Sequence, residues 1–437
     1  MKDEIRQPRS AAETQSIKKR HGRVFGYLEP ASILIVTSGQ QASSYGGARP
    51  CQNMAYLSGL LEPGAAAVFV AQSSGNRSIL FKRERDRSYE LWNGPMLSIA
   101  DARHELGFDQ VFDATEFESE MAKLLRECNV LYFESSSDAA LTTALHRAID
   151  ASRARRNAME IRESRRIMAE LRLVKDDFEI ACMERACELT SIGHTIGMQK
   201  VRPGMHEYGL QAEIEYAFKS RGAESLGYAS IVAAGANGCC LHYTMNNCPI
   251  GETDLVLVDA GAQFRGYTGD VTRTFPASGK FSREQAIVYD IVLDVQEQCV
   301  ARVRPGESHW SLQNFAVKSM CERLHAAGIL DRSPQECVES EDYKRFYGHS
   351  LGHWLGRDVH DLGPSTENGR PRVFQSGNVI TIEPGLYFQR YDERVPEAFR
   401  GIAVRIEDDV LVTESGQRTL TDCVKKRSDI ETLMAGR

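Results

Sequence analysis

Four acidic residues and one histidine in the C-terminal half of the chain have the residue types and the settings of metal ligands. Each acid ends or interrupts a short apolar run, as in Leu255-Val-Leu-Val-Asp259 and Val379-Ile-Thr-Ile-Glu383. A buried carboxylate is costly unless its charge is compensated, and a divalent cation is the strongest compensator. The pattern therefore predicts a metal site whose ligands are Asp259, Asp270, His353, Glu383 and Glu407.

The ligand set is large enough for two metal ions and for hydrolytic chemistry. Two ions about 3.5–4 Å apart need bridging carboxylates, and four acids with one imidazole can build such a cage. Asp259 and Asp270 are expected on adjacent strands of one hairpin, separated by a glycine turn. His353 lies in Gly348-His-Ser-Leu-Gly-His353-Trp-Leu-Gly356, where glycines allow the backbone to approach a site closely.

Two other kinds of site compete in the same region. Cys239-Cys240, close to His242, could be taken for a soft-metal site, but the strong acids nearby are hard ligands and adjacent cysteines rarely both reach one ion. Gly348-His-Ser350-Leu-Gly352 matches the G-x-S-x-G elbow of serine hydrolases, which requires a preceding apolar strand. The preceding residues 341–347 are polar, so the sequence favours metal-dependent hydrolysis.

The chain divides into two regions with different patterns of predicted strands and helices. At 437 residues it is too long for one ordinary core. In the first region, short apolar runs at 32–36, 65–70 and 130–133 alternate with helical stretches such as 116–128, which is typical of an α/β domain. Asp176 followed three residues later by Glu179 predicts the start of a long helix, and we expect the second domain to begin there.

The second region carries an internal repeat. Val201-Arg-Pro-Gly204 with Leu210-Gln211 recurs 102 residues later as Val303-Arg-Pro-Gly306 with Leu312-Gln313. The segments 253–261 and 377–385 also share a pattern of apolar strand, acid and glycine. The second domain is therefore expected to contain two related halves, with a metal site that takes ligands from both.

Composition excludes several other classes. The net charge of −7 comes from 60 acidic and 53 basic residues, and the densest early basic cluster, Lys18–Arg23, is interpreted as a solvent-exposed helix, so no nucleic-acid partner is expected. No apolar stretch has the length of a membrane span, and residues 1–25 lack the apolar core of a signal peptide. The eleven cysteines show no C-x-x-C spacing. These features predict a cytoplasmic protein with reduced thiols and no membrane partner.

The motifs around the predicted ligands resemble those of the bacterial Xaa-Pro aminopeptidases, the aminopeptidase P group of the M24 peptidases. They are Asn237-Gly-Cys-Cys-Leu-His242-Tyr, Gly352-His353-Trp354, Asp358-Val-His360-Asp361, Glu383-Pro-Gly-Leu-Tyr387 and Arg405-Ile-Glu407-Asp-Asp409. The resemblance runs from about Lys175 to the C-terminus and is weaker before it, where it rests on Arg85-Asp86 and Glu90-Leu-Trp92. It implies an α/β N-terminal domain, residues 1–174, with substrate-site and oligomerisation contacts. It also implies an α+β pita-bread catalytic domain with a pseudo-twofold repeat, residues 175–437.

The resemblance also implies roles for individual residues. Asp259, Asp270, His353, Glu383 and Glu407 would hold two Mn²⁺ ions, or Co²⁺, Zn²⁺ or Fe²⁺ in their place. A hydroxide bridging the ions would attack the carbonyl before a penultimate proline, with Glu383 as the proton shuttle. His242, His360 and Arg405 complete the implied catalytic set. His349, Tyr387 and Trp92 are implied at the substrate site, with Trp92 contributed by a neighbouring subunit.

Alternatives and departures accompany this resemblance. The nearest alternative is a prolidase, which uses the same ligands but cleaves only X-Pro dipeptides. Methionine aminopeptidases are disfavoured because they lack a large N-terminal domain. A non-enzymatic pita-bread binding module is disfavoured because it would have lost ligands. The stretch Gln40–Leu61 holds no acid, whereas relatives often place there an acid that pairs with the arginine corresponding to Arg405. Asp408 and Asp409 are interpreted as helix-cap or surface acids. We expect a homodimer or homotetramer that acts on peptides with a penultimate proline.

Overall fold

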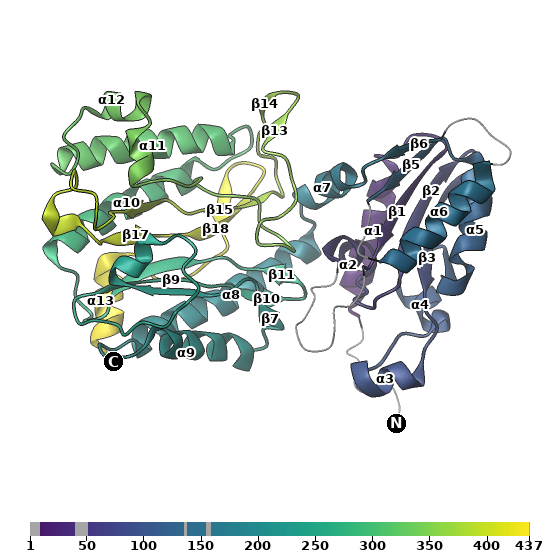
Figure 1. Ribbon diagram of the computed structural model, residues 1–437, viewed down its shortest axis with the longest axis horizontal. Helices are drawn as coiled ribbons and strands as arrows, with labels where there is room; N and C mark the ends of the chain where they lie inside the picture. The colour runs from purple at the N-terminus through teal and green to yellow at the C-terminus, as the bar shows by residue number, and fades with distance from the viewer. Residues whose placement is uncertain (1–8, 40–50, 135–137, 154–158, 437) are drawn as a thin grey trace. The chain divides into compact units, whose positions relative to one another are not determined.

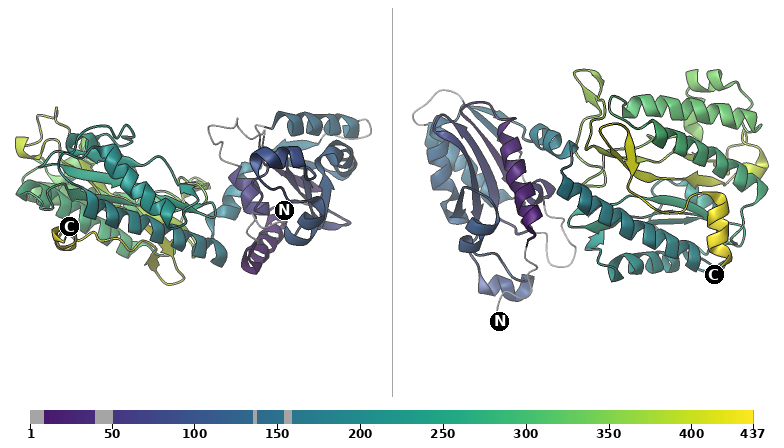
Figure 2. Two further views of the ribbon diagram at one scale, coloured as in Figure 1. Left: turned by 90° about the horizontal axis from the view of Figure 1, so that it is seen from below. Right: turned by 180° about the vertical axis from the view of Figure 1, so that it is seen from behind.

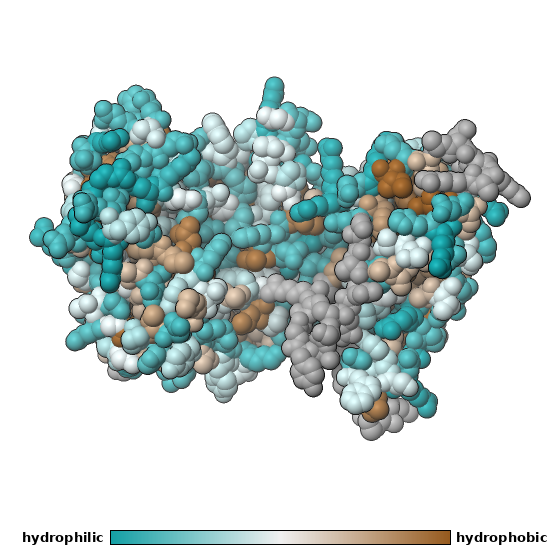
Figure 3. Space-filling view, viewed as in Figure 1, coloured by the Kyte–Doolittle hydropathy of each residue, from teal (hydrophilic) through white to brown (hydrophobic). Residues whose placement is uncertain are grey.

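The computed structural model describes residues 9–39, 51–134, 138–153 and 159–436. The chain forms two compact units, Met1–Leu171 and Arg172–Arg437 (Figure 1). Helix α7 (Arg165–Leu173) contains the point of division. Among the described residues no helix combines the length and apolarity needed to cross a bilayer. On the face shown in Figure 3, hydrophobic residues form small separate patches among hydrophilic ones.

The N-terminal unit is built on a six-stranded mixed sheet with the order β4-β3-β2-β1-β5-β6. The central strands β1 and β2 are antiparallel, whereas β1 with β5, β5 with β6 and β3 with β4 are parallel. The strands are β1 (Ser32–Thr37), β2 (Ala66–Gln72), β3 (Gly75–Lys82), β4 (Gln110–Asp113), β5 (Val130–Phe133) and β6 (Glu160–Arg162). Three of them coincide with the predicted apolar runs, and the predicted α/β class is confirmed.

Helices cover the apolar strands of this sheet. Helices α5 and α6 pack against each other, and Phe117, Met121 and Leu145 on them join Ile33 and Val68 of the sheet in one buried cluster. Helix α1 packs against β2. The helices of this unit are α1 (Ala11–Phe25), α2 (Gln52–Ser58), α3 (Arg87–Asn93), α4 (Ile99–Glu105), α5 (Phe117–Leu124) and α6 (Ala139–Arg153).

The interpretation of Lys18–Arg23 as a fully solvent-exposed helix is wrong for two of its residues. Arg20 and His21 lie on the buried face of α1. Arg20 donates to the carbonyl oxygen of Tyr56 at 2.9 Å and lies over the Tyr56 ring. His21 makes an edge contact with Phe69 of β2 and hydrogen-bonds the carbonyl oxygen of Leu57. A basic side chain can be buried when carbonyl oxygens and aromatic rings contact it. The run of charged residues around Arg20 and His21 gave no indication of these partners.

The buried His21 makes the stability of the N-terminal unit depend on pH. Burial lowers the pKa of His21 from 6.5 to about 4. Between these two pH values the His21 side chain is therefore protonated in the unfolded chain but neutral in the folded unit. The contribution of His21 to the free energy of unfolding should be fully present above pH 6.5. Protonation of His21 in the unfolded chain should lower the free energy of unfolding by about 2 kcal/mol from pH 7 to pH 5. Hydrogen exchange of the amides in β1 and β2, corrected for intrinsic rates at each pH, measures this loss.

The same exchange experiment on His21→Gln should show a smaller pH dependence, because the titrating group is gone. His104→Gln is the matched control, since His104 is exposed in the same unit. Equal pH dependence in the parent protein and in His21→Gln would contradict the assignment.

The catalytic unit begins with the predicted long helix. Helix α8 (Asp177–Lys200) follows Asp176, whose side chain accepts from the backbone N–H of Glu179 while the Glu179 side chain accepts from the N–H of Asp176. This reciprocal capping box satisfies two donors at the start of the helix. The predicted start of α8 is confirmed.

The repeat in the sequence corresponds to two equivalent helix pairs. Helices α8 and α9 (Glu207–Ser220) are joined at Gly204, and α10 (Arg283–Arg302) and α11 (His309–Ala326) are joined at Gly306. Both glycines have positive φ, 85° and 88°, a conformation that favours glycine. In Figure 1 the α10–α11 pair lies above the strands of this unit and the α8–α9 pair below them, and the view from behind in Figure 2 keeps this order. The predicted pseudo-twofold repeat is confirmed.

Each half contributes short antiparallel strands beside its helices. One three-stranded sheet has the order β12-β9-β8 and another the order β15-β18-β19, with β16 paired to β17. These strands are β8 (Ile231–Ala234), β9 (Leu255–Asp259), β12 (Thr272–Pro276), β15 (Val379–Ile382), β16 (Gly385–Tyr387), β17 (Ala403–Arg405), β18 (Asp408–Val412) and β19 (Gln417–Thr419). Their apolar residues join those of α8 to α11 in one core.

The predicted hairpin between Asp259 and Asp270 is wrong in its connection. Strand β9 pairs with β12, and Asp259 lies opposite Thr272. Between them a separate hairpin, β10 (Ala262–Phe264) and β11 (Tyr267–Thr268), extends the chain. Asp270 therefore lies just before β12 rather than on the partner strand, because the glycine turn belongs to the inserted hairpin.

Candidate metal centre and catalytic pocket

A cavity of about 560 Å³ in the catalytic unit brings most of the predicted site residues together. It contains all five predicted ligands and four of the other predicted residues. The predicted residues that line it are His242, Asp259, Asp270, His349, His353, His360, Glu383, Arg405 and Glu407. Its apolar lining includes Ile231, Leu241 and Val359.

Strand ends from both halves of the unit position the acids. Asp259 ends β9, Glu383 follows β15, and Glu407 lies between β17 and β18. Ligand atoms of Asp270, His353 and Glu407 lie within 4.8 Å of one another. The backbone N–H of Glu383 donates to the carbonyl oxygen of Leu351, which ties this acid to the loop that carries His353. The two related halves therefore converge on one cluster of possible ligands.

The imidazole of His353 is oriented by its backbone surroundings. Its Nδ1 lies 3.0 Å from the carbonyl oxygen of Trp354, so Nδ1 carries the proton and Nε2 faces the acids. Nε2 lies 3.4 Å from Asp270 and 3.5 Å from Glu383. Gly352 makes this approach possible, because a Cβ there would lie 1.9 Å from the carbonyl oxygen of Thr381.

Three neighbouring side chains hold the acids in place. The Tyr228 hydroxyl lies 2.6 Å from Asp259 Oδ1 and also contacts Asp270 Oδ1. Arg405 Nη2 donates to Asp259 Oδ2 at 2.6 Å, and Thr272 Oγ1 donates to Glu407 at 2.6 Å. A single hydroxyl proton on Tyr228 cannot serve two carboxylates at once. Unshared lone pairs therefore remain in the cluster.

Burial makes the negative charge of this cluster expensive. Burial raises the pKa of Glu383 to about 7, and it raises the pKa of Asp259 and Glu407 as well. Burial alone would lower the pKa of His353, but Asp270 and Glu383 raise it to about 9. In the metal-free protein the four carboxylates face two cations, Arg405 and the protonated His353, so the site has more acidic groups than positive charges. Carboxylate oxygens and one imidazole nitrogen with unshared lone pairs fit hard or borderline divalent cations.

Two of the predicted histidines in the cavity are neutral near pH 7. Burial lowers the pKa of His349 to about 4 and also lowers that of His360. His349 Nδ1 donates to the carbonyl oxygen of Ser350, so its Nε2 accepts from the hydroxyl of Tyr387 at 2.8 Å. That hydroxyl in turn accepts from Arg405 Nη1 at 3.0 Å. A continuous hydrogen-bond chain thus links Asp259 to His349.

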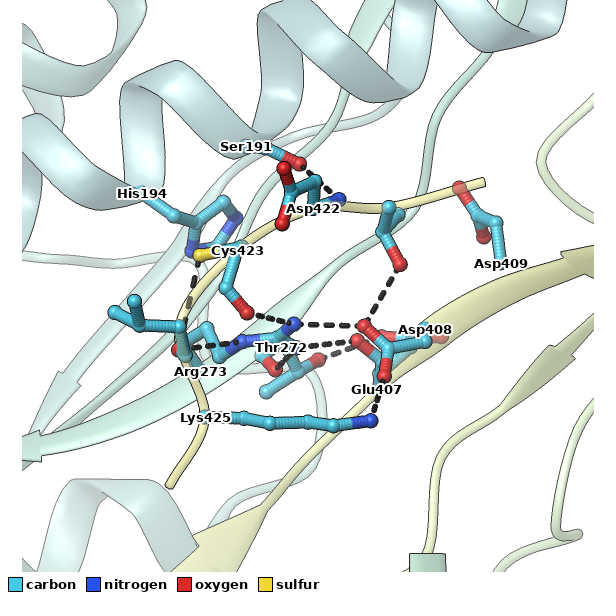
Figure 4. Close-up of polar contacts among 12 residues, drawn as sticks. Ser191, His194, Thr272, Arg273, Glu407, Asp408, Asp409, Asp422, Cys423 and Lys425 are labelled. Carbon is cyan, nitrogen blue, oxygen red and sulfur yellow. Dashed lines mark hydrogen bonds and ion pairs between the residues drawn. The ribbon is translucent and has the colours of Figure 1, made fainter. Parts of the chain in front are cut away.

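The interpretation of Asp408 as a cap or surface acid is wrong. Asp408 begins β18, is buried, and accepts from Arg273 at 2.7 Å and from Lys425 at 2.6 Å (Figure 4). Although burial opposes ionisation, the two cations lower the pKa of Asp408 to about 2. Arg273 also donates to the backbone carbonyl of Glu407. This ion cluster fixes the segment that carries the predicted ligand Glu407.

Asp409 is also buried, which corrects the second of these interpretations. Its Oδ2 accepts from the backbone N–H of Asp270 at 2.9 Å and from Cys187 Sγ at 3.1 Å. Its Oδ1 has no hydrogen-bond partner within the described parts of the chain. Burial and the nearby Asp270 raise the pKa of Asp409 well above its ordinary value, so this acid is neutral. Asp409 thereby positions Asp270 without adding charge.

Sequence reasoning missed several residues that shape the cavity. Tyr228, Thr272 and Glu207 stand outside the quoted motifs. Glu207 accepts from Asn237 Nδ2 and from the Tyr243 hydroxyl, both in the motif that contains His242. These partners lie 30 and 36 residues after Glu207, so no local spacing signalled the contact. His242 itself is exposed at the end of a loop that Glu207 holds.

Trp92 lies in the other unit. It is 84% exposed on helix α3 and does not line the described cavity, so its role at the substrate site stays a prediction. Residues 40–50 of the acid-free stretch lie outside the described part of the chain. Within the catalytic unit, the ionic partner of Arg405 is Asp259.

Comparisons with known proteins agree with this geometry. The sequence profile of metallopeptidase family M24 matches residues 181–414, and that of the aminopeptidase P N-terminal domain matches residues 17–132. The chain is 38% identical to the Xaa-Pro aminopeptidase of Escherichia coli K12, covering 97% of this chain and 98% of that protein. The chain belongs to the Xaa-Pro aminopeptidase group of metallopeptidase family M24. Human Xaa-Pro aminopeptidase 3 is 34% identical to this chain, over 87% of this chain and 75% of the human protein.

Solved structures of this group share the fold. Proline aminopeptidase P II from Yersinia pestis superposes with a TM-score of 0.91 at 36% identity, covering 97% of this chain and 100% of that one. Zinc-substituted E. coli aminopeptidase P in complex with product gives the same TM-score and identity over 98% and 99% of the two chains. The predicted family and fold class are therefore confirmed, and the serine-hydrolase alternative is set aside.

The two neighbouring acids Asp408 and Asp409 should respond differently to the same substitution. Asp409→Asn keeps a neutral acceptor for the Asp270 N–H and should change the free energy of unfolding by less than about 0.5 kcal/mol. Asp408→Asn leaves Arg273 and Lys425 with an uncompensated buried charge and should cost about 3 kcal/mol. Urea denaturation of the chelated, metal-free protein at pH 7 measures both. An Asp409→Asn cost as large as that of Asp408→Asn would contradict a neutral Asp409.

Proposed function

We propose that this chain is a dinuclear metallo-exopeptidase that removes the first residue from peptides whose second residue is proline. One observation carries the proposal: five side chains suited to bind metal, with more acidic groups than positive charges, share a single cavity with two neutral histidines. One of these histidines, His349, is oriented by the hydrogen-bond chain from Arg405 through Tyr387. Such a centre can activate water for the hydrolysis of a peptide bond without a side-chain nucleophile. The relatives named Xaa-Pro aminopeptidase support the substrate class.

Asp259, Asp270, His353, Glu383 and Glu407 would hold the metal ions. When bound, two divalent cations lower the pKa of water and stabilise the charge that develops on the attacked carbonyl oxygen. The acid-rich donor set accommodates Mn²⁺, Co²⁺, Zn²⁺ or Fe²⁺, and we propose Mn²⁺ as the resident ion.

Glu383 has the properties of a proton carrier. As a carboxylate beside His353, it would accept a proton from the attacking water and return it to the imino nitrogen of the leaving proline. Its backbone bond to Leu351 and its place after β15 fix the carboxylate beside His353.

The histidines bind and orient the substrate in this proposal. His242 and His360 would donate to the scissile or the proline carbonyl oxygen, because an imidazole N–H is a hydrogen-bond donor. His349, held by Tyr387 and Ser350, lines the place of the proline ring. Ile231, Leu241 and Val359 give the same cavity apolar surface for that ring. Arg405 holds Asp259 in position and joins it to Tyr387.

The setting of the enzyme is also a proposal. All eleven cysteines are free thiols and one of them, Cys240, is exposed, which supports a reducing compartment such as the cytoplasm. We propose a homodimer or homotetramer, with Trp92 of one subunit reaching the substrate site of another. The N-terminal unit would supply these contacts.

Peptide cleavage tests the proposal directly. Protein loaded with manganese should release arginine from Arg-Pro-Pro, and Glu383→Ala should lower kcat/KM by at least about a hundredfold because the proton carrier and a ligand are lost. Release of the first amino acid, followed by mass spectrometry, measures both. Glu393→Ala is the matched control, since Glu393 is an exposed glutamate in the same region.

The dipeptide Ala-Pro separates the proposal from its nearest rival. Cleavage of the tripeptide supports an Xaa-Pro aminopeptidase, whereas cleavage confined to Ala-Pro would identify a prolidase. Inactivity on both peptides despite bound metal would refute the proposed function.

A further inference from the structure

A second cavity adjoins the metal centre. It has a volume of about 430 Å³ and shares four lining residues with the catalytic cavity. The shared residues are Ser350, Gly352, His353 and His360. The two cavities therefore meet at a metal ligand and at a histidine assigned to substrate binding. The proposed reaction at the metal centre gives the second cavity no role.

Two walls of the second cavity come from separate segments of the catalytic unit. One wall is the start of helix α11, with His309 and Trp310, and another includes Thr366 and Pro371 of the hairpin β13 (Thr366–Glu367) and β14 (Arg370–Pro371). The two turn residues between these strands, Asn368 and Gly369, both have positive φ, which is typical of a tight type I′ hairpin. Such a turn fixes the hairpin as a wall of constant shape.

Trp310 is the most unusual residue of this cavity. It is 64% exposed although tryptophan usually buries most of its ring surface. Its neighbour His309 packs edge-on against Trp354 at 4.5 Å, which anchors the start of α11 on the floor of the cavity. Because Trp310 both lines a formed cavity and leaves its ring exposed, the ring is free to stack against a bound side chain.

Helix α11 is tied to the loop that carries the metal ligand. The side chain of Gln313, one turn after Trp310, accepts from the backbone N–H of Leu351 at 2.5 Å. His353 lies two residues further along that loop. The distance between Trp310 and the metal centre is therefore set by the fold, as a subsite for a substrate of defined geometry requires.

The direction of the substrate follows from His360. Under the proposed function, on which this step rests, His360 hydrogen-bonds a carbonyl oxygen next to or within the proline. The peptide continues from the proline carbonyl toward its C-terminus, and His360 is one of the four residues that line both the catalytic cavity and the second one. The first residue of the peptide is at the metal centre, so only the residues after the proline can enter the second cavity.

We propose that the second cavity binds the third and fourth residues of the substrate and that Trp310 makes it selective for aromatic or large apolar side chains. The favoured substrates are then peptides of four or more residues with such a side chain after the proline. An aromatic contact with an exposed indole is worth about 0.5–1.5 kcal/mol, which corresponds to a preference of about three- to tenfold in kcat/KM.

Two tetrapeptides test the proposal, Ala-Pro-Phe-Phe and Ala-Pro-Gly-Gly, with the metal-loaded full chain. The parent protein should cleave the aromatic peptide with a kcat/KM about three- to tenfold higher. Trp310→Ala should remove this preference and leave kcat/KM for Ala-Pro-Gly-Gly within about twofold, and Trp310→Phe should restore part of the preference. Tyr216→Ala is the matched control, because Tyr216 is an exposed aromatic residue on α9 outside both cavities.

The outcomes separate this subsite from the proposed function. If the parent protein cleaves both peptides equally, or if Trp310→Ala keeps the preference, the subsite is refuted and the function stands. An equal loss on both peptides in Trp310→Ala and in Trp310→Phe would show that Trp310 only supports the fold, which also refutes the subsite. If the parent protein cleaves neither peptide, the proposed function fails and the subsite fails with it.

Discussion

The structure of the catalytic unit depends on the cost of burying four carboxylates in one small cavity. Asp259, Asp270, Glu383 and Glu407 come from strand ends and adjoining segments in both halves of the unit, and Arg405 and His353 offset only part of their charge. Burial, together with mutual repulsion, raises the pKa of Asp259, Glu383 and Glu407. Such a cluster is stable when protons or metal cations neutralise it. The surrounding hydrogen bonds hold the four acids close together and leave some of their lone pairs free to bind cations.

Two neighbouring acids show how the surroundings of the site avoid adding further charge. Asp408 is ionised but has Arg273 and Lys425 beside it, so its charge is compensated locally. Asp409 has no cation, is neutral, and serves as an acceptor for the Asp270 backbone. The charges of the five proposed ligand side chains are less fully compensated than that of Asp408. This contrast distinguishes the structural ion cluster at Asp408 from the proposed metal site at the neighbouring Glu407.

The sequence predicted the features that depend on local patterns. The acids after apolar runs, the capping box at Asp176 and the repeated Val-Arg-Pro-Gly turns each carry their signal within a few residues, and the structure has them where predicted. The features that failed depend on distant partners. Arg273 lies 135 residues before Asp408, and nothing near either residue indicates the pair. Tyr228 and Glu207 were missed for the same reason, because a hydroxyl or carboxylate acquires its role only when the fold brings its partners to it.

Metal content is the most direct test of this account. After dialysis against manganese and removal of loosely bound ions, the protein should hold two divalent ions per chain by elemental analysis, and its urea midpoint should lie well above that of the chelated protein. Asp270→Asn should hold fewer ions and lose most of this stabilisation. A parent protein that binds no divalent ion, or whose stability is the same with manganese and with chelator, would contradict the claim that metal cations compensate the buried carboxylates.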